Sequence, residues 1–159
     1  MTDTSALEQD AIVRLLRAWD EKAIAEVIEF RGETTIAVPR EHLRRACEFL
    51  RSDPELAFNF LSDLSCRDCF PAEPRFEVNY HLLSIPHKRR LRLKVRVNGA
   101  DPVVESVTTV WPTANWHERE VFDLFGVRFE GHTDLRRIVL PEDWEGYPLR
   151  KDYPTEGYR

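Results

Sequence analysis

The strongest constraint on this chain is a strict two-residue alternation of apolar and polar side chains over two neighbouring stretches. Apolar residues take every second position over 76–82, and again over 91–97, where arginine or lysine stands between them. A period of two gives a β-strand one dry face and one wet face. The sequence therefore predicts two strands joined as an antiparallel hairpin, with Asn98-Gly99 as the turn after the second strand.

Helical periodicity, with apolar residues three or four positions apart, precedes this hairpin. It predicts a helix within 5–30, which Gly32 would end, and another within 40–51. The β-branched run 34–38 between them favours a short strand. The apolar stretch 58–64 is too short to separate a strand from a helix.

After the hairpin, residues 103–110 are rich in valine and predict a further strand. Asn115 followed by Glu118 resembles a capping box, which predicts a helix that begins there and ends at Gly126. Internal repeats are absent. The fold class that these elements predict is α+β, a mostly antiparallel sheet with helices packed on it, over residues 1–126.

Residues 127–159 differ from everything before them. They hold three of the six glycines and three prolines, and show neither helical nor strand periodicity. Such a segment cannot build a core alone, yet Trp144, Tyr147 and Tyr153 are too bulky and apolar for a free linker. We therefore expect an extended C-terminal arm that docks on a partner protein.

Composition narrows the class of protein. The longest apolar runs are far below the roughly 18 residues of a membrane span, and acidic residues among the first twenty argue against a secretory or mitochondrial signal. The net charge of −5 disfavours nucleic acid as a default partner, and three cysteines suit a reducing compartment rather than a disulfide framework. These features predict a cytosolic protein.

Motifs for metal or cofactor binding are incomplete. Cys66 and Cys69 form one C-x-x-C pair, which supplies two ligands where a structural zinc site or a cluster needs about four. His117-Glu118 begins an H-E-x-x-H pattern, but Val121 stands where the second histidine is required. Glycine-rich nucleotide-binding motifs are absent. The sequence predicts no metal and no cofactor in this chain.

Two charged stretches leave alternatives open. Six basic residues fall within 88–96, which fits an RNA-binding face or a solvated face that docks on acidic protein. RNA-binding sheets add aromatic side chains for base stacking, and here the residues between the bases are Leu and Val. The acid-rich turn 117–123 favours a structural or interfacial role, because carboxylates two positions apart on a helix point to different faces.

A resemblance to a known family rests on the run 118–127, E-R-E-V-F-D-L-F-G-V, on Gly131-His132 and on 135–138, L-R-R-I. The following run 140–154, L-P-E-D-W-E-G-Y-P-L-R-K-D-Y-P, continues it. These residues strongly resemble the 30 kDa subunit family of respiratory complex I, the NADH:quinone oxidoreductase. Thr133 departs from the proline usual after the Gly-His pair.

This resemblance implies a non-catalytic structural subunit of the peripheral arm of a proton-translocating enzyme. Members carry no flavin and no iron–sulfur cluster, which belong to other subunits, and pack on the large subunit of the quinone site. The chain would then lie at the cytoplasmic side of a bacterial inner membrane, attached only through the complex. A same-family complex fed by ferredoxin or a hydrogenase partner, and an RNA-binding module, remain as alternatives. The residues expected at partner interfaces are Glu118, Arg119, Glu120, Asp123, His132, Arg136, Arg137, Trp144, Tyr147, Arg150, Lys151 and Tyr153.

Overall fold

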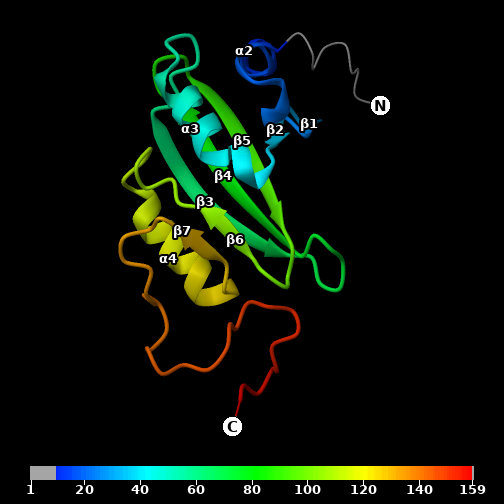
Figure 1. Cartoon of the computed structure of the whole chain (residues 1–159), viewed down its shortest axis with the longest axis vertical. Helices are drawn as coiled ribbons and strands as arrows, with labels where there is room; N and C mark the ends of the chain where they lie inside the picture. The colour runs from blue at the N-terminus through cyan, green and yellow to red at the C-terminus, as the bar shows by residue number, and fades with distance from the viewer. Residues whose placement is uncertain (1–9, 159) are drawn as a thin grey trace.

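The computed structural model describes residues 10–158 and contains a five-stranded sheet in the order β1-β2-β5-β4-β3. Its long strands are β3 (Phe60–Asp68), β4 (Phe76–Ser84) and β5 (Arg89–Val97), and its short strands are β1 (Glu26–Phe30) and β2 (Glu33–Ala37). A separate two-stranded sheet pairs β6 (Val103–Glu105) with β7 (Arg128–Glu130). Figure 1 shows both sheets with the helices in front of them.

The predicted hairpin is confirmed as β4 and β5, which pair antiparallel along their whole length. Val78 lies opposite Val95 and Tyr80 opposite Leu93, so the apolar side chains share one face. The sheet is mostly antiparallel, as expected, but β2 joins β5 in parallel, and β6 joins β7 in parallel. The α+β class follows from this sheet and the helices on it.

The helices cover the apolar face of the sheet. They are α2 (Ala11–Trp19), α3 (Leu43–Ser52) and α4 (Ala114–Phe125), and their buried residues join those of the strands in one hydrophobic core. The carboxylate of Asp10 caps α2 by accepting from the N–H of Ile12 at 2.7 Å. Among the described residues, no helix combines the length and the apolar character that crossing a membrane requires.

Several predicted boundaries are wrong for local reasons. The helix predicted within 5–30 ends at Trp19, because Asp20 adopts an extended backbone and caps the 3-10 turn η1 (Glu21–Ala23), after which β1 begins. Residues 5–9 of that prediction lie outside the described residues. A 3-10 turn, η2 (Arg40–His42), likewise precedes α3.

The second half of the fold corrects three further predictions. The ambiguous stretch 58–64 contributes to strand β3, and the strand predicted over 103–110 is only β6. Asn115 lies inside α4, so the predicted capping box does not form. β7 falls where no regular element was predicted, and it pairs with β6.

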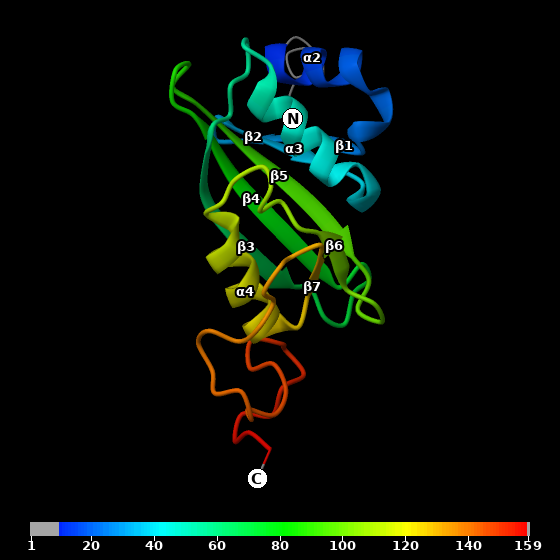
Figure 2. The same ribbon diagram turned by 60° about the vertical axis from the view of Figure 1, so that its left-hand side comes forward.

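After β7, the chain forms neither helix nor strand through 131–158, which we call the C-terminal segment. Figures 1 and 2 both show most of this segment beyond the end of the five-stranded sheet, below α4, while its first residues run beside α4. The strands and helices of residues 10–130 thus form the packed body to which the segment is attached.

Candidate subunit interface at the C-terminal segment

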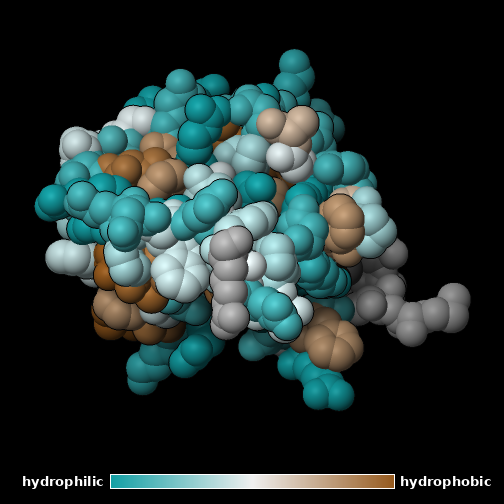
Figure 3. Space-filling view, turned by 90° about the horizontal axis from the view of Figure 1, so that it is seen from below, coloured by the Kyte–Doolittle hydropathy of each residue, from teal (hydrophilic) through white to brown (hydrophobic). Residues whose placement is uncertain are grey.

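The C-terminal segment exposes apolar surface. None of residues 131–158 falls in the buried class. Five of the ten large apolar side chains that are exposed in the described chain lie on this segment, so this surface is concentrated at one end of the molecule. Figure 3 looks at that end and shows apolar side chains gathered towards one side of it. The five are Ile138, Val139, Trp144, Leu149 and Tyr158.

One buried carboxylate holds the start of this segment. Asp123 of α4 is fully buried, and its Oδ2 accepts from the backbone N–H groups of Ile138, Val139 and Leu140 at 2.8–3.0 Å. Its Oδ1 accepts from Arg137 Nη1 at 2.7 Å. Burial alone would raise the pKa of Asp123, but these four donors lower it below its usual value. The carboxylate therefore stays charged and fixes the backbone of 138–140.

Two arginines donate to backbone carbonyl groups of the C-terminal segment. Arg119 donates from Nε to the carbonyl of Arg136 at 3.1 Å and from Nη2 to that of Arg137 at 3.2 Å. Arg137 in turn donates from Nη2 to the carbonyl of Gly146 at 3.0 Å, and its guanidinium lies over the Tyr147 ring. The charged anchor at Asp123 therefore extends further along the segment, to Gly146 and Tyr147.

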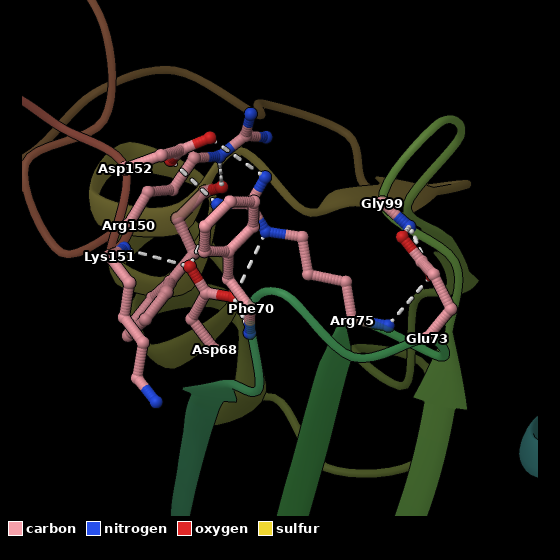
Figure 4. A network of polar contacts seen from close by, with 9 residues as sticks. Asp68, Phe70, Glu73, Arg75, Gly99, Arg150, Lys151 and Asp152 are labelled. Carbon is pink, nitrogen blue, oxygen red and sulfur yellow. Dashed lines mark hydrogen bonds and ion pairs between the residues drawn. The ribbon is translucent and has the colours of Figure 1, made fainter.

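A second anchor joins the segment to the end of the sheet (Figure 4). Arg75 donates to both oxygens of Asp68 at 2.8–2.9 Å and to both oxygens of Asp152 at 2.7–3.0 Å. Asp68 also accepts from the backbone N–H of Lys151 at 2.8 Å. Burial opposes ionisation of Asp68, but hydrogen bonds from Arg75, Lys151 and Phe70 lower its pKa to about 2. The anchor is thus ionised at neutral pH.

Arg150 and Gly126 complete the attachment beneath α4. The Arg150 guanidinium lies between the rings of Tyr147 and Phe76, 4.7 and 5.2 Å from their centroids, and its Nε donates to the carbonyl of Phe125 at 2.6 Å. Gly126 ends α4 with a φ of +75°, and a Cβ there would lie 2.6 Å from the Tyr147 ring. Only glycine satisfies both the backbone and this close approach.

Glu118 lies in the interior of the packed body. Its Oε2 accepts from Ser106 Oγ and its Oε1 from the N–H of Val107, both at 2.7 Å, which ties α4 to the loop after β6. Burial raises the pKa of Glu118 to about 7 despite these two hydrogen bonds. This residue stabilises the fold locally and has no route to a partner through its side chain, which is fully buried.

The structure divides the twelve predicted interface residues into two groups. One group bonds within the chain. Arg137 binds the carboxylate of Asp123, and Arg150 donates to the carbonyl of Phe125. The other group keeps exposed surface for a partner. The first contains Glu118, Arg119, Asp123, His132, Arg136, Arg137, Arg150 and Tyr153 by hydrogen bonds, and Tyr147 by ring contacts, and the second contains Glu120, Trp144 and Lys151.

Sequence reasoning missed Asp68, Arg75 and Asp152. Asp68 stands between the two cysteines that drew attention as metal ligands, and Asp152 is 77 positions from Arg75. No periodicity or motif links such distant residues, so only the fold brings them together. Among residues 10–158, no group of three or more potential ligands lies close enough to hold a metal ion.

The basic stretch of β5 is largely paired with acids of this chain. Arg89 binds Asp10, Arg92 binds Glu33, and Lys94 and Arg96 both contact Glu77. These ion pairs neutralise basic side chains that an RNA-binding face would need for the RNA phosphates. Lys88 and Arg90 make no ion pair with any described residue. The outer face of the sheet therefore carries both positive and negative side chains, most of them in ion pairs.

Comparison with known proteins gives concordant results. Residues 36–159 match the family model of the respiratory-chain NADH dehydrogenase, 30 Kd subunit. The chain is 50% identical over 149 residues to an NADH-quinone oxidoreductase subunit of Roseiflexus sp. (strain RS-1), and the match covers 94% of this chain and 86% of that protein. It is 52% identical over 128 residues to an NADH-quinone oxidoreductase subunit of Rhizobium etli (strain CIAT 652), covering 80% and 68%.

Two solved structures share the fold. Nqo5, as a trypsin-resistant fragment (1–134), superposes with a TM-score of 0.67 at 34% identity over 77% of this chain and 97% of that one. A chain of the archaeal membrane-bound sulfane sulfur reductase gives a TM-score of 0.75 at 27% identity over 93% and 86%. With the family model spanning most of its length, the chain belongs to the 30 kDa subunit family of the respiratory-chain NADH dehydrogenase.

Proposed function

We propose that this chain is a non-catalytic structural subunit in the peripheral arm of a proton-translocating NADH:quinone oxidoreductase. In this role it holds neighbouring subunits in place while electrons pass from NADH through flavin and iron–sulfur centres on those subunits to quinone. The naming of its relatives as NADH-quinone oxidoreductase subunits, at about half identity over most of the chain, supports this assignment.

The single observation that carries the docking role is the C-terminal segment itself. Its backbone is fixed by buried charges at Asp123 and Asp68, while Val139, Trp144 and Leu149 remain 41–56% exposed. Rigid aromatic and aliphatic side chains beside arginines are typical of the centres of protein interfaces. A segment that were only closing its own core would bury these groups. We therefore place the contact with the large quinone-site subunit here.

A complex with another electron donor is the second candidate within the family. The likeness to a chain of the sulfane sulfur reductase favours it, since that assembly is also a respiratory membrane complex. Its identity of 27% is about half that of the NADH-quinone oxidoreductase relatives, which supports the first candidate. The RNA-binding alternative loses support, because Arg89, Arg92 and Arg96 are already paired with carboxylates.

We assign the cofactors to other subunits. The two cysteines of the C-x-x-C pair contribute no complete ligand set with other described residues, and burial raises the pKa of Cys66 to about 12, which keeps the thiol protonated. We expect the purified chain to show no visible absorbance and no stoichiometric metal. A bound flavin or cluster in the isolated chain would contradict this. We place the complex at the cytoplasmic side of a bacterial inner membrane.

The docking role is tested by affinity purification from detergent-solubilised membranes of cells that carry a tagged chain. We expect the tagged wild-type chain to recover the large subunit, and Trp144→Ala or deletion of 141–159 to abolish this recovery. Ile85→Ala is the matched control, because Ile85 is 57% exposed but lies at the far end of the hairpin. Circular dichroism checks that each variant is folded. Normal recovery by the truncated chain would refute the proposal.

A further inference from the structure

The end of the C-terminal segment contains a hollow that its own chain leaves open. This hollow, of about 360 Å³, is lined by the rings of Trp144, Tyr153 and Tyr158 and by three acidic residues. A second hollow of about 450 Å³ shares Trp144 and Tyr153 with it and adds Pro148 and Pro154. The two therefore adjoin across the same pair of rings. The three acidic residues of the first are Asp143, Glu145 and Glu156, and we call this first space the aromatic–acidic hollow.

The rings of this hollow are held in place by local packing. Tyr153 and Tyr158 meet edge to face, with centroids 5.3 Å apart and planes at 85°. Both rest on Gly146, where a Cβ would lie 2.8–2.9 Å from each ring, and the φ of +79° there also requires glycine. Gly146 is itself fixed by the hydrogen bond from Arg137 to its carbonyl. The hollow is thus connected to the Asp123 anchor and is preformed.

The charges around the hollow have one sign. Asp143, Glu145 and Glu156 line it, no basic residue does, and none of the three carboxylates forms an ion pair with any residue in 10–158. Asp152, nearby in sequence, differs, because Arg75 neutralises it. Three aromatic rings and three carboxylates without an ion pair among residues 10–158 form an environment that attracts a cation, since ring quadrupoles and carboxylates both stabilise positive charge.

We infer that the aromatic–acidic hollow receives an arginine or lysine side chain of the subunit on which the segment docks. The cationic head would lie among the rings and carboxylates, and the aliphatic stem along the proline-lined hollow beside it. This inference rests on the proposed docking function and adds to it the chemistry of the partner residue. It also explains why bulky rings stand beside carboxylates that form no ion pair with any residue in 10–158.

The first test measures docking in the solubilised complex at low and high salt. We expect the double variant Glu145→Gln/Glu156→Gln to remain docked, but its affinity for the partner subunit should fall about ten-fold at low salt. Its affinity should also depend on salt much less than that of the wild-type chain. Glu142→Gln is the control, because Glu142 is exposed in the same stretch but lines neither hollow. Equal retention of the double variant, the control and the wild type at both salt concentrations would overturn the inference while leaving docking intact. The deletion of 141–159 tests the proposed docking function separately from this inference.

The second test needs no partner. The full chain, labelled with ¹⁵N at its tryptophan indoles, is titrated with N-acetyl-arginine amide and with the uncharged isostere N-acetyl-citrulline amide. We expect the arginine probe alone to shift the Trp144 signal, which Trp144→Phe assigns. A shift with both probes, with neither, or with magnesium chloride at lower concentration would overturn the assignment.

Discussion

The packed body of residues 10–130 and the C-terminal segment owe their order to different interactions. The body buries Val78, Tyr80 and Leu93 against three helices, so its order follows from apolar burial. The segment has no buried residue and is held by carboxylates and guanidinium groups. This difference teaches how a protein can keep apolar side chains outside its core. Charged anchors fix the backbone, and the apolar side chains then stay available to another surface.

The largest test of this contrast removes the first anchor. Asp123→Asn keeps the size of the side chain but places an amide N–H₂ group against donors, and it leaves the half-buried Arg137 without its carboxylate partner. We expect the free energy of unfolding to fall by about 3 kcal/mol, within the range for breaking a buried ion pair. Limited proteolysis should cleave 131–158 while the body resists.

Glu120→Gln is the control for this variant, since Glu120 lies on the same helix and is exposed. If Asp123→Asn unfolds at the same denaturant concentration as the control and its segment resists the protease equally, the segment has another source of order.

The second anchor should give a somewhat smaller effect. Arg75→Met leaves Asp68 buried without its cation, although the N–H groups of Lys151 and Phe70 still reach it. We expect a loss of about 2 kcal/mol at neutral pH by denaturant unfolding. Asp152→Ala should cost less than about 1 kcal/mol, because Asp152 is 43% exposed and solvent screens its charge.

Acid titration sharpens this prediction. The pKa of Asp68 in the folded chain, about 2, lies below its usual 3.8, so its ionisation stabilises the fold above about pH 4 and this contribution is lost as the pH falls towards 2. Arg75→Met should lose much of this acid sensitivity. If the free energies of unfolding of the variant and the wild type change in parallel between pH 4 and pH 2, the ion pair of Asp68 with Arg75 does not stabilise the fold.

A third test concerns the packed body alone, where the pH dependence of stability should have the opposite sign to that of Asp68. The pKa of Glu118 is raised from 4.5 to about 7, so the folded chain binds more protons than the unfolded chain between these values. Stability therefore decreases as the pH rises through this window, by up to about 1.4 kcal/mol per pH unit from this group. Glu118→Gln should remove that slope. If the difference in free energy of unfolding between the variant and the wild type stays constant from pH 4.5 to 7, the pKa of Glu118 is not raised in the folded chain.

The smallest effect on stability is expected at the exposed rings. Trp144→Ala should change the free energy of unfolding by no more than about 0.5 kcal/mol, as is usual for exposed positions. Trp111→Ala, which removes a buried ring of the body, is the comparison and should cost about 3 kcal/mol or more. Similar losses for the two variants, measured by thermal or denaturant unfolding, would mean that the segment and the body share one core.

The sequence predicted those parts of the fold that depend on local periodicity. Strands β4 and β5 were predicted correctly because a sustained alternation is a direct consequence of one-sided burial. The first helix was predicted too long, because Ala23 and Val27 continue its helical spacing although they lie in η1 and β1. The parallel joining of β2 to β5 has no local signature at all.

The candidate site was predictable in type but not in its contacts. Trp144, Tyr147 and Tyr153 stood out because bulky rings occur among glycines and prolines. The anchors could not be found, because Asp68 meets Lys151 across 83 positions, and three of the four donors to the Asp123 carboxylate are backbone N–H groups of 138–140. Bonds to backbone N–H groups leave no trace in residue types, so the partners of Asp123 become visible only in three dimensions.

The position of both anchors has a consequence for biosynthesis. Asp68, Arg75 and Asp123 all precede the C-terminal segment in the chain, and each is in place only when the sheet and α4 have formed. The residues that anchor the segment are therefore synthesised before it. A copy whose sheet has failed to form lacks these anchors and cannot hold the rings in place, so docking through the ordered segment would require a folded body.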